Sequence, residues 1–191
     1  MQITMLGTGH AMVTECYNTC FLLTEGDRNF LVDGGGGNGI LRQLKCAGYH
    51  CTDIRDIFVT HKHIDHLLGV VWVVRTICQR IAQGTAMIDV NIYAHVEVIV
   101  LIGDLLKKLL WREQWEKAGS HIHLIAVEDG ETKNILGRKT TFFDIGSIKE
   151  KQFGFCMDLD NGRKLTCCGD ASFHPCAGAY VDTSEWLMHE A

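Results

Sequence analysis

The stretch THKHIDHLLG, residues 60–69, places three histidines and one aspartate within six positions. It follows an apolar run, residues 54–59, that has the composition of a buried strand. Side chains two positions apart on a strand point to the same side, so His61 and His63 should share one side, and a turn would bring Asp65 and His66 beside them. Imidazole and carboxylate ligands suit zinc, manganese or ferrous iron. The stretch therefore predicts a metal site, with room for two ions, where a strand ends.

The alternative is a loop of exposed polar residues without a ligand. Three histidines crowded against the end of an apolar strand have no packing role, so we favour the metal site.

The rest of the chain reads as mixed α/β. Apolar runs of strand length predict strands at residues 2–6, 19–24, 29–33, 57–60, 90–94, 121–127, 139–145, 153–159 and 163–168. Longer amphipathic stretches predict helices at residues 40–49, 66–84 and 96–119, and the DNG at residues 160–162 predicts a hairpin.

Composition narrows the class of protein. The 191 residues are 47% hydrophobic with a net charge of -5, which predicts one globular domain over residues 1–191 and argues against a broad basic surface for nucleic acid. No secretion signal and no spanning apolar run is seen, so we expect a cytoplasmic protein without a membrane partner. The nine cysteines, an odd number, are expected to be reduced.

Several motifs together resemble one family. THKHIDHLLG is similar to the H-x-H-x-D-H signature of the metallo-β-lactamase fold. FLVDGGGG (residues 30–37), TCCGDA (166–171) and WLMHEA (186–191) resemble further segments of that family in the same order, the last of them in its ribonuclease Z branch. LGTGHA (residues 6–11) resembles the start of ribonuclease Z-like chains. The resemblance spans nearly the whole chain.

The resemblance implies a four-layer αββα sandwich, in which two mixed β-sheets pack face to face with helices outside. It also implies a metal-dependent hydrolase that uses an activated hydroxide, with zinc as the cofactor and manganese or iron as alternatives. The implied roles are one metal on His61 and His63, a second on Asp65 and His66, a bridge at Asp170, support from Asp33, and proton donation by His189 with Glu190 or Asp65.

The sequence also departs from the family pattern. Gly146 stands where the resemblance leads us to look for another ligand histidine, and the chain ends at Ala191, where family members continue. We therefore expect a C-terminally shortened fold with weakened metal binding. An exposed sheet edge would then favour a homodimer.

Three functions stay open on this basis. The first is a phosphodiesterase of the ribonuclease Z type, for which RNA is one substrate and a small phosphodiester another. The second is a hydrolase of a small thioester, ester or lactam. The third is a ligand-depleted domain that binds metal with little or no catalysis.

Other histidines have weaker claims. His121 and His123 have ligand-like spacing on one predicted strand, but without a third group nearby we interpret them as an exposed strand face. His10 lies in the turn after the first strand, from which a loop can line the mouth of a site. His95 is interpreted as a helix-start residue and His174 as a loop residue.

Overall fold

Two β-sheets form the centre of the computed structural model, which describes residues 1–172 and 174–189. The first sheet has the strand order β1-β2-β3-β4-β5-β6, with β1–β3 antiparallel and β3–β6 parallel. Its strands are β1 (Gln2–Gly7), β2 (Cys20–Glu25), β3 (Arg28–Val32), β4 (Ile54–Phe58), β5 (Val90–Ala94) and β6 (Ile122–Ala126). The second sheet has the order β11-β10-β9-β8-β7. Its strands are β7 (Thr132–Ile135), β8 (Arg138–Asp144), β9 (Phe153–Asp158), β10 (Lys164–Cys167) and β11 (Ser184–Met188).

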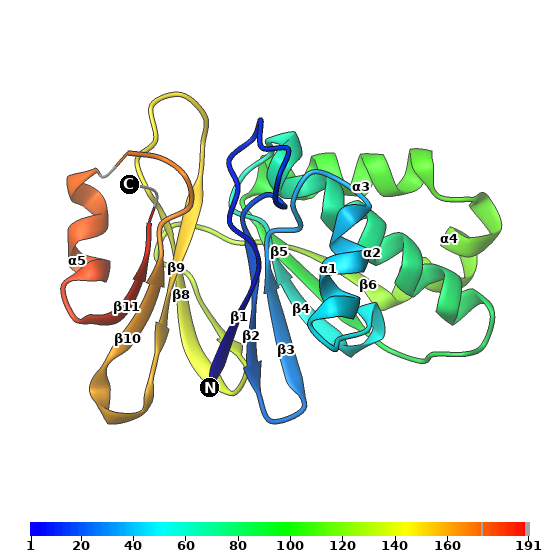
Figure 1. Ribbon diagram of the computed structural model, residues 1–191, viewed down its shortest axis with the longest axis horizontal. Helices are drawn as coiled ribbons and strands as arrows, with labels where there is room; N and C mark the ends of the chain where they lie inside the picture. Colours follow the sequence, from blue (N-terminus) through cyan, green and yellow to red (C-terminus); the bar gives the residue numbers. More distant parts are fainter. Residues whose placement is uncertain (173, 190–191) are drawn as a thin grey trace.

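Helices cover the outer faces of both sheets. Figure 1 shows α1 (Gly39–Cys46), α2 (Ile64–Ala82), α3 (Val96–Leu109) and α4 (Arg112–Ala118) on the side of the first sheet, and α5 (Gly178–Val181) on the side of the second. Tyr180 of α5 stacks on Phe143 of β8, with ring centroids 4.0 Å apart. The described residues also include four short 3-10 turns: Cys51–Asp53, Gly119–His121, Asp160–Gly162 and Pro175–Ala177. The predicted four-layer sandwich is confirmed.

Alternate residues of the central strands enter two different cores. On β2, Cys20 and Leu22 pack among the residues beneath the helices, whereas Phe21 and Leu23 pack between the sheets. The inter-sheet core is aromatic, and Phe155 meets Phe30 and Phe58 edge to face with centroids 5.5 Å and 5.7 Å apart. Burial on both faces explains why these strands read as continuous apolar runs rather than alternating ones.

One predicted helix and two strands differ from the expectation. The single helix predicted at residues 96–119 is wrong: α3 ends at Leu109 and α4 begins at Arg112, with Leu110 extended and buried between them. The break lets α4 turn back to contact α2. The strands β7 and β11 were not predicted, whereas the hairpin between β9 and β10 is confirmed.

Two further observations concern membrane-spanning helices and disulfides. Within the described residues, no helix combines the length and the apolar character needed to cross a bilayer. All nine cysteines lie in the described part of the chain, and each is a free thiol.

Close glycine contacts hold the loop after β3 against α2. Gly34 N–H donates to the carbonyl of His66, and Gly69 N–H donates to that of Gly35, both at 2.8 Å. A Cβ at Gly69 would lie 1.7 Å from the Gly34 oxygen. Only glycine allows this approach, which brings the loop after β3 next to the first turn of α2.

Gly69→Ala should therefore force the two segments apart. We expect it to lower the free energy of unfolding by roughly 1–3 kcal/mol, measured by urea denaturation. Gly37→Ala is the matched control, because a Cβ there meets nothing within 4 Å. Equal stability of the two variants would contradict the packing argument.

Candidate metal centre

Parallel pairing brings two loops to one sheet edge. Val32 of β3 lies opposite Phe58 of β4, so the residues after both strands emerge side by side. The first loop begins with Asp33, and Asp33 N–H donates to the carbonyl of Phe58 at 2.8 Å. The second continues through Thr60 to His63, which is the N-cap of α2. The histidines and Asp33 therefore meet because of strand register rather than sequence proximity.

The Asp33 carboxylate holds Thr60 and His66 in place at this sheet edge. It accepts hydrogen bonds from Thr60 N–H and Thr60 Oγ1, both at 2.9 Å, and from His66 Nδ1 at 2.8 Å. Asp33 is buried and has a φ of 56°, a left-handed conformation that aspartate tolerates better than most residues. Because Nδ1 of His66 is held by Asp33, its Nε2 is the atom left to face the site.

Thr60 links the Asp33 carboxylate to the ring of His61. The Thr60 hydroxyl proton goes to Asp33, so its oxygen accepts from His61 Nδ1, 3.0 Å away. His61 then carries its lone pair on Nε2, which lies 2.8 Å from His63 Nδ1. Thr60 was not singled out from the sequence, although it stands in the stretch quoted first.

Asp170 reaches the same point from the second sheet. It follows β10 after Gly169, whose φ of 66° turns the chain toward the histidines. Asp170 Oδ1 lies 3.4 Å from His61 Nε2, and Oδ2 lies 3.2 Å from His66 Nε2. Oδ1 is buried and has no hydrogen-bond partner within residues 1–172 and 174–189. A buried carboxylate oxygen that has no hydrogen bond and lies close to an imidazole lone pair fits the role of a metal ligand.

The side chains form two overlapping ligand sets. His61, His63 and Asp170 offer one set, and Asp65, His66 and Asp170 the other, with the ligand atoms of each set within 4.8 Å of one another. In the described part of the chain these are the only such sets. Nitrogen and carboxylate oxygen donors suit zinc, manganese or iron, so the residues present fit a divalent metal.

The histidine pKa values differ strongly. Burial lowers the His66 pKa, but the carboxylates of Asp33 and Asp170 outweigh it and raise the pKa to about 10. Burial lowers the His61 pKa to about 4, and the neighbouring His66 adds to that effect. Burial acts to raise the Asp170 pKa, yet His66 and His61 hold it well below its usual range. In the metal-free site at neutral pH, His66 is therefore an imidazolium, His61 a neutral imidazole and Asp170 a carboxylate.

Zinc binding should consequently release a proton. A metal needs the His66 Nε2 lone pair, so the proton that the raised pKa retains at pH 7 must leave, and the apparent zinc affinity should rise with pH by up to about tenfold per unit. Titration calorimetry in buffers of different ionisation enthalpy measures this proton. His123→Ala, which removes an exposed imidazole elsewhere, should leave the proton count unchanged. A binding enthalpy independent of buffer would contradict the prediction.

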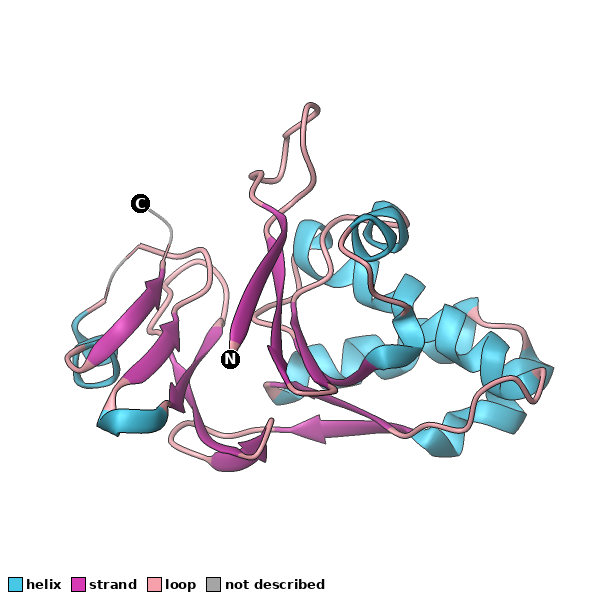
Figure 2. Cartoon of the chain, turned by 60° about the horizontal axis from the view of Figure 1, so that its bottom comes forward, coloured by secondary structure: helices cyan, strands magenta, loops and turns pink. Residues whose placement is uncertain are grey.

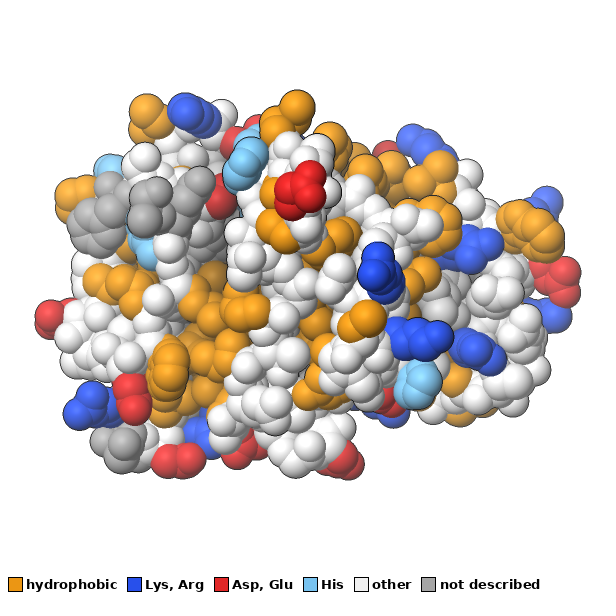
Figure 3. Space-filling view, in the orientation of Figure 1, with side chains coloured by type: hydrophobic (Ala, Val, Ile, Leu, Met, Phe, Trp, Pro, Cys, Tyr) orange, Lys and Arg blue, Asp and Glu red, His pale blue; other side chains and the backbone are white. Residues whose placement is uncertain are grey.

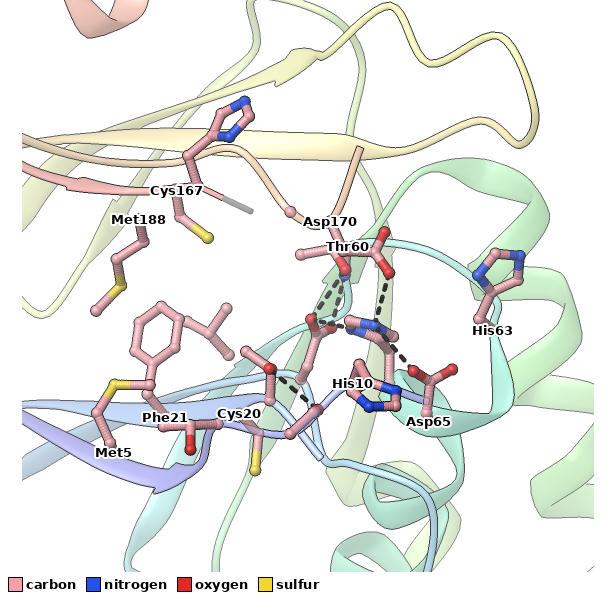
Figure 4. A pocket seen from close by; sticks show the side chains of 18 of the residues that line it. Met5, His10, Cys20, Phe21, Thr60, His63, Asp65, Cys167, Asp170 and Met188 are labelled. Carbon is pink, nitrogen blue, oxygen red and sulfur yellow. Dashed lines mark hydrogen bonds and ion pairs between the residues drawn. The ribbon is translucent and has the colours of Figure 1, made fainter. Parts of the chain in front are cut away.

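A cavity of about 670 Å³ opens beside the metal-binding side chains. In Figure 4, Thr60, His63, Asp65 and Asp170 stand on one side of it, and Met5, Phe21, Cys167 and Met188 on the other. Figure 3 shows hydrophobic side chains gathered in the hollow between β1–β2 and β10–β11. One wall is thus ionic and the other apolar.

The remaining predicted residues are placed as follows. Asp65 lies in the first turn of α2, with Oδ2 3.5 Å from His66 Nε2. His189 lines the cavity after β11, whereas Glu190 and Ala191 lie outside the described residues. Gln152, which the sequence did not suggest, approaches the Asp170 N–H at 3.4 Å through Oε1.

Gly146 is not a simple vacancy for a histidine. Its φ is 73°, and its N–H donates to Asp144 Oδ1 at 2.8 Å. A Cβ there would lie 2.7 Å from His174 Nδ1 and 2.9 Å from Cys176 Sγ. A histidine at this position would strain the backbone and displace both neighbours.

His121 and His123 have a partner that the sequence did not reveal. Asp89 Oδ1 lies 3.3 Å from His121 Nδ1 and 3.0 Å from His123 Nε2. Asp89 precedes the neighbouring strand β5, so the partner comes from sheet pairing. The three side chains do not bring their ligand atoms together as the metal-binding sets do.

Comparison with known proteins assigns the chain to a family. The family model described as anti-Pycsar protein Apyc1 matches residues 1–191. A ribonuclease Z from Methanothermobacter thermautotrophicus is 38% identical over 71 residues, which are 37% of this chain and 22% of that protein. The match with this relative thus spans less than a quarter of its length.

Solved structures show the same fold. The short form of human tRNase Z has a TM-score of 0.71 and 19% identity, with 98% of this chain and 76% of that one covered. The metallo-β-lactamase-fold protein YhfI from Bacillus subtilis has a TM-score of 0.74 and 17% identity, with 97% and 69% covered. The predicted metallo-β-lactamase fold, with ribonuclease Z-like neighbours, is confirmed.

Proposed function

Since this chain belongs to the family described as anti-Pycsar protein Apyc1 and has the fold of metal-dependent hydrolases, we propose that it is a metal-dependent phosphodiesterase. The observation that carries the proposal is the pair of ligand sets sharing Asp170 at the wall of an open cavity. Two adjacent metal sites suit the hydrolysis of a phosphodiester. The attacking oxygen and the leaving oxygen lie on opposite sides of phosphorus, and two ions can stabilise the charge on both.

Each residue has a defined part in this proposal. His61 and His63 would hold one ion and Asp65 and His66 the other, with Asp170 shared. When bound, such ions bring the pKa of water toward neutrality and offset the charge of the phosphate. Asp33 fixes the orientation of His66.

Proton transfer falls to the chain's own groups. Asp65 has its carboxylate beside His66 and at the cavity wall, so we assign it the acceptance of a proton from the attacking water. His189, which follows β11 and lines the same cavity, is the proposed donor to the leaving oxygen. Glu190, predicted as its partner, is outside the described residues.

The apolar wall bears on which phosphodiester is accepted. Met5, Phe21 and Met188 line the cavity opposite the ionic side chains. A substrate with a flat apolar group, such as an aryl ring or a nucleobase, would bury that group there while its phosphate met the metals. Zinc is the first metal to test, with manganese and iron as alternatives.

The direct test is hydrolysis of bis(p-nitrophenyl) phosphate by zinc-loaded protein. A chromogenic β-lactam and a thioester, assayed in parallel, distinguish the small-substrate alternative. Turnover of the phosphodiester alone is expected. Zinc binding without turnover of any of the three would support the metal-binding domain instead.

Asp65→Ala should lower phosphodiester turnover by at least about 100-fold, because it removes both a ligand and the proton acceptor. The fold should persist, which near-identical thermal unfolding of the metal-free proteins would show. Asp104→Ala, on the exposed face of α3, is the control. Unchanged turnover by Asp65→Ala would remove it from the mechanism.

A further inference from the structure

The loop between β1 and β2 is a built feature of the cavity mouth. Figure 2 shows it standing beyond the ends of the two strands. Its base is closed by Gly9 N–H donating to the Tyr17 carbonyl at 2.8 Å and by Thr19 N–H donating to the Gly9 carbonyl at 2.9 Å. The His10 carbonyl accepts from Asn18 Nδ2 at 3.0 Å and from Val13 N–H at 3.1 Å. The backbone of His10 is thus held from two directions.

The same loop is tied to the segment beside the metal-binding side chains. Asn18 Oδ1 accepts from Gly36 N–H at 3.1 Å, and Tyr17 Oη lies 2.8 Å from the carbonyl oxygens of Gly34 and Gly37. Burial raises the Tyr17 pKa to about 12, so the hydroxyl stays protonated and donates to these carbonyls. A Cβ on Gly36 would lie 3.7 Å from the Cα of Asp65. The loop that carries His10 is therefore hydrogen-bonded, through Asn18, to the segment that passes close to Asp65.

The hydrogen bonding of the ring decides its tautomer. His10 Nδ1 accepts from Met12 N–H at 3.2 Å, so in the neutral ring the proton is on Nε2. Within the described residues, no protein group accepts a hydrogen bond from this Nε2–H. His10 lines the same cavity as His63, Asp65 and Asp170 (Figure 4). The cavity is thus lined both by an N–H donor and by side chains that would hold metal.

We propose that His10 is a catalytic residue that donates a hydrogen bond from Nε2 to a non-bridging oxygen of the bound phosphodiester. This inference rests on the proposed function. A phosphate oxygen is an acceptor that this tautomer can serve, and the contact needs no transfer of a proton. The role is distinct from those of the ligand side chains, because His10 belongs to neither ligand set.

The donor acts without changing its own protonation. In the hydrolysis, the oxygen of water forms a bond to phosphorus, the bond from phosphorus to the leaving oxygen breaks, and one water proton ends on that leaving oxygen. Negative charge on the non-bridging oxygens is redistributed as the new bond forms. The Nε2–H of His10 stabilises that charge and keeps its proton throughout.

The test compares His10→Ala, His10→Gln and Met12→Ala in the zinc-loaded protein. Glutamine retains an N–H donor at a similar reach, and Met12→Ala changes an exposed side chain of the same loop while keeping the N–H that His10 accepts. Affinity for inorganic phosphate, affinity for zinc, and kcat and KM for bis(p-nitrophenyl) phosphate are measured for each.

His10→Ala should lower phosphate affinity and kcat/KM by roughly 10- to 100-fold, because a hydrogen bond to a charged group is lost. Zinc affinity should stay within about twofold, since a residue that only shaped the metal centre would change it. His10→Gln should recover part of the loss, and Met12→Ala should match the parent.

The outcomes separate this inference from the proposed function. Unchanged phosphate affinity and kcat/KM in His10→Ala, or a glutamine variant as poor as the alanine one, overturns the His10 assignment. Absence of phosphate binding by the zinc-loaded parent overturns it as well. Phosphate binding that depends on His10, without turnover of any phosphodiester, supports the His10 contact and rejects the phosphodiesterase.

Discussion

Replacing Asp170 by asparagine should weaken zinc binding strongly and remove phosphodiester turnover. Asp170 is the only member shared by the two ligand sets among the described residues, and its two oxygens face different histidines. An amide keeps the volume but not the charge that balances a divalent ion. We expect zinc affinity to fall by at least roughly 100-fold, since even residues that only support a ligand typically account for 10- to 100-fold.

Two measurements check the Asp170 prediction. Zinc should raise the melting temperature of the parent, because it binds the folded arrangement, and should leave that of Asp170→Asn nearly unchanged. Phosphodiester turnover should fall to background. Asp158→Asn, at the exposed end of β9, controls for the loss of one carboxylate. A variant that still gained stability from zinc would show that Asp170 does not join the two sets.

Replacing Asp33 by alanine should have the second large effect, and chiefly on stability. The substitution removes the acceptor for Thr60 N–H, Thr60 Oγ1 and His66 Nδ1 at once, and leaves a buried imidazolium without its nearest carboxylate. Removing one partner of a buried charge pair destabilises by about 3–5 kcal/mol. The left-handed φ of 56° adds strain for alanine.

The Asp33 effect can be separated from backbone strain. Asparagine adopts the left-handed conformation readily, so Asp33→Asn should carry little backbone strain. Any decrease in its free energy of unfolding, measured by urea denaturation, therefore reports the missing charge. Because the Asp33 carboxylate raises the His66 pKa, both variants should titrate His66 at lower pH by NMR. Asp27→Ala, in the exposed turn before β3, is the control. If Asp33→Ala were as stable as this control, Asp33 would not be the support of the site.

Local sequence determined much of the site. Local backbone geometry is enough to bring together the side chains of His61, His63, Asp65 and His66. They lie between the end of β4 and the first turn of α2, only a few residues apart in sequence. The strands β2–β5 and the hairpin between β9 and β10 were read from apolar runs and turn residues for the same reason. Asp33 and Asp170 were named from resembling motifs, because nothing in their neighbours distinguishes them from turn residues.

Only tertiary structure decided the rest, because it depends on which distant backbones meet. The break between α3 and α4 arises where Leu110 is buried and α4 turns to α2, although residues 96–119 carry one uninterrupted helical pattern. Asp89 meets His121 and His123 across a sheet. The left-handed backbone at Gly146, crowded by the side chains of His174 and Cys176, disfavours the histidine that the family pattern would place there. A sequence records the side chains at each position, but the direction in which a backbone presents them is set by the packing of segments that are far apart along the chain.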